Sequence, residues 1–247
     1  MRVLVTRPPV QSERLGGQLL AAGFQPLIAP MIDIQPLGEE CNAEISHRLK
    51  TVSVCDGVIA ISTNAVNYAL ARLEQDGRDV PKQCRWYAIG NATAKAMMQA
   101  GLQPVLPQGR FNTETLLELP DFQNIQGCSF VLLAGRDGRR MLEESLVARG
   151  AHVERIELYQ RVPRDPQKTP VSEEPEVLTA MSGETLEALL QHMDSHSVKG
   201  WLKKPLFVPS LRIAKLAFRL GYQNVRVTAN ATENSLIEAL SRFASEV

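Results

Sequence analysis

The fold is decided by the stretch that begins GVIAISTN at Gly57–Asn64 and continues to Leu119, because the same pattern returns 120 positions later. Gly101 falls on Gly221 at this offset. Four helix-spaced apolar positions fall on four others: Val66, Ala69, Leu70 and Leu73 on Leu186, Leu189, Leu190 and Met193. The spacing i, i+3, i+4, i+7 is typical of a helix with one buried face. An offset that holds along the whole stretch predicts two copies of one fold.

Each copy alternates short apolar runs with helical patterns. Val3-Leu4-Val5 opens the first copy and Phe130–Ala134 opens the second, and each is followed by a helical segment that stops at a glycine, Gly23 or Gly150. Continuous apolar runs are typical of strands covered on both faces, and a β-α-β rhythm indicates parallel sheets. We therefore predict an α/β protein with a flavodoxin-like count of strands in each copy.

Two of the expected strands are longer than their sheets need. Period-2 alternation runs from Leu27 to Leu37 in one copy and from Val153 to Val162 in the other, whereas a strand usually has about 5 to 6 residues. We expect the two overlong strands to pair with each other and to bridge the two halves.

Composition excludes several classes of protein. The chain has 27 basic and 27 acidic residues, so its formal net charge is zero and nucleic acid is not an expected partner. A membrane span is not expected, since no apolar run approaches about 18 residues. The start of the chain shows no export signal, and four cysteines without a C-x-x-C pair are expected to be reduced thiols, which predicts a cytoplasmic protein.

The candidate site residues lie where strands end and helices begin. Ligands of open parallel sheets bind beyond the carboxyl ends of the strands, where free backbone N–H groups and the helix dipole favour carboxylate or phosphate. The residues in these turns that could bind a substrate are Thr6, Arg7, Ser62, Asn64, Gly90, Thr93, Arg136, Ser182, Gly183 and Ser210. Each hydroxyl taken singly is more simply a helix N-cap, so a binding role depends on several of them converging.

Two other motifs do not support a dinucleotide site or a metal site. Gly135-x-x-Gly138 resembles half of a phosphate loop but lacks the third glycine and an acidic residue about twenty positions on, so a dinucleotide site is not expected. His192 and His196 have a spacing compatible with metal binding, but no third ligand lies nearby in a polar segment. A solvated surface is the better interpretation of this pair, and neither a metal nor a cofactor is predicted.

Tyr159 differs from these because it lies on one of the bridging strands. It could be an aromatic side chain packed between the two lobes. It could also be a general acid, since the phenol of a tyrosine ordinarily titrates at about pH 10 and so keeps a proton at neutral pH.

The ordered motifs of the chain resemble those of the uroporphyrinogen-III synthase family. They are Leu4-Val5-Thr6-Arg7-Pro8, Ile61-Ser62 with Asn64-Ala65-Val66, Tyr87-Ala88-Ile89-Gly90 with Thr93-Ala94, Leu133 with Gly135-Arg136 and Gly138-Arg139, Tyr159-Gln160-Arg161, Ser182-Gly183-Glu184, and Ala214 with Ala217 and Gly221. Their order and spacing carry the likeness, which covers nearly the whole chain.

The resemblance implies an exchange of opening strands between two domains. Residues 1–36 would join 162–247 in one α/β domain, and residues 37–161 would form the other. The strands at about 31–37 and 156–162 would form a two-stranded β linker between these flavodoxin-like parallel-sheet domains.

The resemblance also implies an activity. The family is a group of cofactor-independent lyases of haem biosynthesis: the linear tetrapyrrole hydroxymethylbilane loses water and closes into uroporphyrinogen III with ring D inverted. Tyr159 matches the family's tyrosine that is proposed to protonate the departing hydroxyl, and Thr93 and Ser182 match hydroxyl positions at the family's site. Met181 stands where the family often has threonine. A monomer is expected.

The alternative is a two-lobed cytoplasmic sensor of a small ligand, or a solute-binding protein. Either would also hold a small molecule with duplicated α/β lobes. The missing export signal and the absence of a DNA-binding segment ahead of Val3 speak against both.

Overall fold

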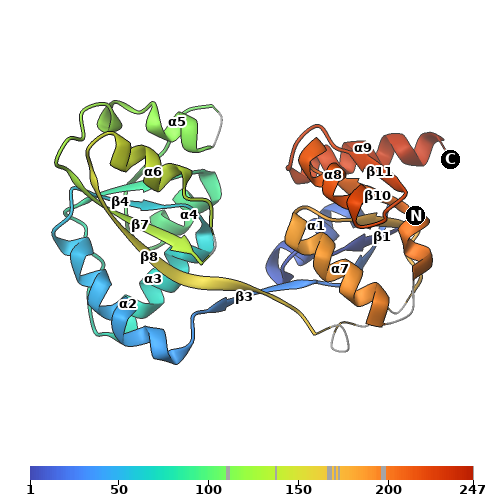
Figure 1. Ribbon diagram of the computed structural model, residues 1–247, viewed down its shortest axis with the longest axis horizontal. Coiled ribbons are helices and arrows are strands. Elements are labelled where there is room, and N and C mark those ends of the chain that lie inside the picture. Colours follow the sequence, from blue (N-terminus) through green and yellow to red (C-terminus); the bar gives the residue numbers. More distant parts are fainter. Residues whose placement is uncertain are drawn as a thin grey trace. The chain divides into compact units, whose positions relative to one another are not determined.

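The computed structural model describes residues 1–109, 112–136, 138–165, 169, 171, 173–195 and 199–246. Asp137 of the glycine-containing turn and His196 of the histidine pair lie outside the described residues. The chain divides into two compact units, one made of Met1–Asp33 and Val162–Val247 and the other of Ile34–Arg161 (Figure 1).

The first unit is built on a five-stranded sheet with the order β11-β10-β9-β1-β2. The strands are β1 (Arg2–Val5), β2 (Gln25–Ile28), β9 (Val177–Thr179), β10 (Pro205–Val208) and β11 (Asn224–Val227). Every neighbouring pair is parallel. Val3, Leu4 and Val5 have no exposed surface. Their continuous apolar run therefore marks a strand covered on both faces, as predicted.

Helices cover both faces of this sheet (Figure 1). They are α1 (Pro9–Ala21), α7 (Gly183–Ser195), α8 (Leu211–Arg219) and α9 (Glu233–Glu246). Apolar residues of α7 and α8 pack with Leu4, whereas those of α1 and α9 pack with Val3 and Val5. The two faces are separated in this way because successive side chains of a strand point to opposite sides.

The second unit is built on a six-stranded sheet with the order β3-β8-β7-β4-β5-β6. The strands are β3 (Ile32–Pro36), β4 (Gly57–Ala60), β5 (Arg85–Ala88), β6 (Pro104–Val105), β7 (Ser129–Gly135) and β8 (His152–Pro163). The pairs from β8 through β6 are parallel. The prediction of an α/β protein with parallel sheets is therefore confirmed.

The helices of the second unit also lie on both faces. They are α2 (Asn42–Arg48), α3 (Thr63–Gln75), α4 (Asn91–Gln99), α5 (Thr113–Leu117) and α6 (Met141–Ala148). Short 3-10 helices occupy Glu39–Cys41, Leu49–Ser53, Pro120–Phe122 and, in the first unit, Lys199–Lys203. Helices α2, α3 and α4 pack with Val58 and Ala60 of β4, whereas α5 and α6 pack with Ile59. No helix in the described part of the chain is long and apolar enough to cross a membrane.

The predicted repeat appears in the bounds of the helices. Adding 120 to the bounds of α3 and α4 gives those of α7 and α8. Gly101 and Gly221 follow α4 and α8 with φ of 76° and 95°. That left-handed conformation favours glycine and ends a helix. The repeat inferred from side-chain spacing is therefore confirmed.

One predicted bridging strand is broken. Alternation over residues 27–37 predicts a single strand, but β2 ends at Ile28 and β3 starts at Ile32. Pro30 lies in the gap and has no N–H to donate to a strand ladder. The N–H groups of Ala29 and Met31 on either side of it still donate to the carbonyls of Val5 and Thr6, at 2.9 and 3.1 Å. The apolar alternation continues across this break, which is why the prediction was wrong.

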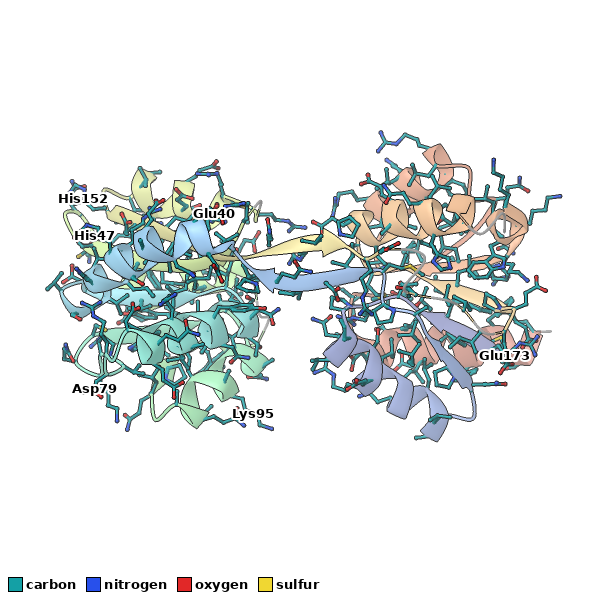
Figure 2. All side chains as sticks on the ribbon, turned by 90° about the horizontal axis from the view of Figure 1, so that it is seen from below. Glu40, His47, Asp79, Lys95, His152 and Glu173 are labelled. Carbon is teal, nitrogen blue, oxygen red and sulfur yellow. The ribbon has the colours of Figure 1, made fainter. Side chains whose placement is uncertain are left out.

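The prediction that the two bridging segments pair is confirmed. β3 and β8 are neighbours in the second sheet, and both pass from one compact unit to the other (Figure 2). Leu37 N–H donates to the carbonyl of Leu158 at 3.4 Å, and Arg164 N–H donates to that of Met31 at 2.9 Å. One set of residue numbers falls as the other rises, so the two strands are antiparallel.

Tyr87 on β5 makes the second unit sensitive to alkaline pH. Burial raises the pKa of Tyr87 to about 12, with a further contribution from Asp121, whose carboxylate accepts a hydrogen bond from the phenol at 2.9 Å. Its stabilising effect is complete below the unfolded pKa of about 10 and is lost as the pH rises through the folded value. We predict that the unfolding free energy of Tyr87→Phe falls less between pH 10 and pH 12 than that of the unchanged chain, because no buried phenol has to ionise in the folded state. Urea unfolding at several pH values measures this, and an unchanged slope would contradict it.

Candidate active site

Tyr159 lies near the end of the paired part of β8, opposite Gly135 of β7. Its side chain is 3% exposed. The ring stacks on Tyr68 with the centroids 5.9 Å apart. A Cβ atom at position 135 would lie 2.6 Å from the Tyr159 ring, so the ring packs against bare backbone. The phenol is therefore held in one place but is not open in this structure, and its catalytic role stays a prediction.

The phenol of Tyr159 reaches the start of α3. Its Oη lies 2.9 Å from Oγ of Ser62, and either hydroxyl could be the donor. Ser62 is the N-cap of α3, and its Oγ accepts the N–H of Ala65 at 3.1 Å. If Ser62 donates to Tyr159, the phenolic proton remains available to another acceptor. The pair can thus hold the proton-donating orientation of a tyrosine.

We predict that Ser62→Ala lowers the unfolding free energy of the second unit by about 1 to 3 kcal/mol, because both a cap and the partner of a buried phenol are lost. In a Tyr159→Phe background the same change should cost about 1 kcal/mol less, since only the cap remains to be lost. Denaturant unfolding of the four chains gives the coupling energy. A coupling near zero would show that the two hydroxyls do not depend on each other.

The start of α4 lies beside the start of α3. β4 and β5 are parallel neighbours, so the helices that follow them begin at the same edge of the sheet. Gly90 is the N-cap of α4 in extended backbone and offers no side chain. Thr93 in the first turn is 4% exposed, whereas Asn64 in the first turn of α3 is half-buried. The structure therefore brings four predicted residues to one edge, with Thr93 covered.

Arg136 joins this group through β8. Its backbone N–H donates to the carbonyl of Tyr159 at 2.7 Å. Its guanidinium is 41% exposed and lies 3.8 Å from the carboxylate of Glu157. The guanidinium also donates to Oε1 of Gln160 at 3.4 Å, so an anionic ligand at this position would compete with Glu157 and Gln160 for it.

The turn after Gly135 is held by a buried arginine of β8. Arg155 is 6% exposed and donates to the carbonyl of Gly135 at 3.0 Å. It also lies 3.7 Å from Glu143 and 3.4 Å from Glu157. The carbonyl of Gly135 is therefore bonded to an arginine of the same unit. The described part of the turn does not favour a phosphate loop.

The first unit contains the other predicted site residues. Ser182 Oγ accepts the N–H of Thr185 at 3.2 Å, and Ser210 caps α8 by accepting the N–H of Ile213 at 3.4 Å. β9 and β10 are parallel neighbours, so these two caps lie at one edge. Gly183 has a packing reason to be glycine, since a Cβ there would lie 2.9 Å from Leu216.

Thr6 and Arg7 follow β1 at the same edge. Thr6 has no exposed surface, and its hydroxyl donates to the carbonyl of Thr179 at 2.6 Å. Its burial does not support the expected contact of this hydroxyl with a substrate. Arg7 is 19% exposed, and its Nη1 lies 3.6 Å from the carboxylate of Glu233.

Sequence reasoning missed a cavity of about 380 Å³ in the first unit. It is lined by Arg7, Arg14 and Gln18 and by the turn 231–234 before and into α9. Thr232 caps α9 by accepting the N–H of Ser235 at 3.3 Å. The hydroxyl followed by a helical pattern was a signal that could have added this turn to the others.

The interpretation of His192 as a solvated residue is wrong. His192 is 1% exposed, and its ring lies 6.0 Å from the Trp201 ring. It follows Leu189 by three positions and so shares the buried face of α7. No group of three or more potential metal-ligating residues occurs among the residues that the structure describes.

A family model described as uroporphyrinogen-III synthase HemD matches residues 13–238. The chain belongs to the uroporphyrinogen-III synthase family. The uroporphyrinogen-III synthase of Salmonella typhimurium LT2 is 36% identical over 247 residues, which cover 97% of this chain and 100% of that protein. The uroporphyrinogen-III synthase of Escherichia coli K12 is 34% identical with the same coverage.

Solved structures of uroporphyrinogen-III synthases share the fold. A mutant enzyme from the extremely thermophilic bacterium Thermus thermophilus aligns with a TM-score of 0.63 at 20% identity, covering 100% of both chains. The enzyme from Helicobacter pylori 26695 aligns with a TM-score of 0.60 at 12% identity, covering 98% of each chain. The predicted family is confirmed, and with it a lyase of tetrapyrrole biosynthesis. The sensor alternative is not favoured.

Proposed function

We propose that this chain closes hydroxymethylbilane to uroporphyrinogen III, with loss of water and inversion of ring D. The observation that carries the proposal is the family match over residues 13–238, together with relatives aligned over 97% of the chain. The reaction as proposed uses no metal or cofactor, and the protein acts as a cytoplasmic monomer. The four cysteines, all free thiols, agree with a reducing compartment.

The fold proposed for this activity is a pair of flavodoxin-like domains with exchanged opening strands, residues 1–36 with 162–247 and residues 37–161. The strand order supports it. Counting β1, β2, β9, β10 and β11 as 1 to 5, the first sheet reads 2-1-3-4-5. Counting β7, β8, β4, β5 and β6 in the same way, the second sheet also reads 2-1-3-4-5 before β3 is added. This is the flavodoxin-like order, and each sheet takes its opening pair from the other copy.

In the proposed reaction Tyr159 is the general acid. The hydroxyl of the bilane leaves as water once the phenol gives it a proton, and a positioned acid typically contributes about 10²- to 10⁴-fold. Support comes from the hydrogen bond with Ser62: when Ser62 is the donor, the phenolic proton stays free for another acceptor. The side chain is 3% exposed, so the proposal requires that the hydroxyl be uncovered when the substrate binds.

The carboxylates of the bilane would be held at helix starts. Ser62, Gly90 and Ser210 are N-caps, and each first turn has backbone N–H groups without intrahelical acceptors. Each such contact contributes about 0.3 to 1 kcal/mol. Binding energy spread over adjacent helix starts of one unit, such as those at Ser62 and Gly90, would hold the bilane in a folded form with its end rings close, which favours closure.

The experiment is an isomer assay. The protein is incubated with freshly made hydroxymethylbilane, and the uroporphyrin isomers are separated after oxidation. We expect the type III isomer. The type I isomer alone, which is the product of closure without inversion, would contradict the proposal. A sample unfolded beforehand is the control for spontaneous closure.

A further inference from the structure

The cavity of about 380 Å³ in the first unit joins two turns that follow different strands. Arg7 follows β1, and Arg14 and Gln18 lie further along α1. Residues 231–234 follow β11 and begin α9. Helices α1 and α9 pack on the same face of the sheet, so their starts meet there.

The cavity has an excess of positive charge. The carboxylate of Glu233 is buried and accepts hydrogen bonds from Nε and Nη2 of Arg14 at 3.1 and 2.7 Å. Arg7 lies 3.6 Å from the same carboxylate oxygen. Burial lowers the pKa of Arg7, Glu233 opposes this effect and Arg14 adds to it. One carboxylate therefore faces two guanidinium groups, and an anion bound beside Arg7 would balance the second.

Neutral donors complete the cavity wall. Thr232 caps α9, but the N–H groups of Glu233 and Asn234 have no acceptor within the helix because they lie in its first turn. They stand at the positive end of the helix dipole. Oε1 of Gln18 is buried and accepts no hydrogen bond from any residue that the structure describes. This oxygen is an acceptor and offers nothing to an anion, so the neutral donors of the wall are the two backbone N–H groups.

We propose that this cavity binds one carboxylate side chain of the tetrapyrrole, an acetate or a propionate, through Arg7, Arg14 and the first turn of α9. The identity of the ligand rests on the proposed function. The planar fork of an arginine matches the two oxygens of a carboxylate, which favours this ligand over a halide or a neutral group. Glu233 holds Arg14 in place and weakens the binding of the substrate by its own negative charge.

The test uses the two partners of one ion pair. Arg14→Gln should raise the KM for the bilane about 10-fold with kcat unchanged, because it removes binding that is equal in the ground and transition states. Glu233→Gln should lower KM about 3-fold, because a competing negative charge is removed while a side chain of the same size remains. A purely structural ion pair would make both variants change KM in the same direction. Arg242→Gln, an exposed change near the far end of α9, is the matched control and should keep the wild-type KM.

A binding assay separates this inference from the proposed function. Uroporphyrin III, a fluorescent macrocycle with acetate and propionate side chains, is titrated into each chain without turnover. Weaker binding to Arg14→Gln and tighter binding to Glu233→Gln support the subsite. Equal binding, or shifts in the same direction, overturn it even if type III product forms. If no type III product forms, the proposed function fails and the porphyrin titration alone decides the carboxylate subsite.

Discussion

Tyr159→Phe is expected to lower kcat for bilane closure by about 10- to 100-fold, because it removes the proposed proton donor and little else. The ring would keep its stacking on Tyr68, with the centroids 5.9 Å apart. The loss is expected in kcat more than in KM, since the proton is transferred only in the transition state. Steady-state rates, with separation of the isomers, measure both quantities.

Tyr68→Phe is the matched control for this change. Tyr68 belongs to the same aromatic pair, but its hydroxyl donates to the carbonyl of Ile34 at 3.0 Å and not to Ser62. The Tyr68→Phe variant loses one phenol hydroxyl of the same aromatic pair. Its kcat is expected to stay within about 3-fold of the unchanged chain, because only a structural hydrogen bond of about 1 kcal/mol is removed. Wild-type turnover in Tyr159→Phe would exclude Tyr159 from the chemistry.

Gly135→Ala is expected to reduce both stability and turnover. The new Cβ would lie 2.6 Å from two ring carbons of Tyr159 and 3.0 Å from its hydroxyl oxygen. A rigid ring cannot give way by rotating a terminal bond, so it must move from its place beside Ser62. Overpacking of this kind costs about 1 to 3 kcal/mol. Because the phenol is displaced, kcat should fall about as far as in Tyr159→Phe, by roughly 10- to 100-fold.

Gly17→Ala is the control for the glycine substitution. Gly17 lies on α1, and a Cβ at this position would meet nothing within 4 Å. The change should stabilise the first unit by about 0.5 to 1 kcal/mol, since alanine loses less backbone freedom in a helix. Denaturant unfolding and the isomer assay are run on both variants. Wild-type stability and turnover in Gly135→Ala would contradict the close packing of this glycine on Tyr159.

The correct predictions rest on patterns that are local in the sequence. The repeat with an offset of 120 could be read because helix spacing records which side of each helix is buried, and α3, α4, α7 and α8 follow it. The pairing of the bridging segments was predicted because a strand longer than its sheet must find another partner. The serine caps were predicted because a capping bond spans only three residues, as from Ser62 to Ala65.

The errors come from contacts that local spacing does not record. Residues 27–37 keep their apolar alternation across Pro30, so a broken strand resembles a continuous one. His192 looked solvated because its neighbours in sequence are polar, whereas packing of α7 buries it beside Trp201. The arginine cavity was missed because Arg14 and Glu233 are 219 positions apart.

By itself, the sequence determined the α/β class, the duplication, the family and the set of turns in which a site could lie. These follow from local periodicity and from the order of motifs along the chain. Only the tertiary structure decided that Tyr159 meets Ser62, which is 97 positions away, and that Arg7 and Arg14 share one carboxylate. The physical reason is that such contacts depend on strand order and register, which bring distant segments to one edge of a sheet.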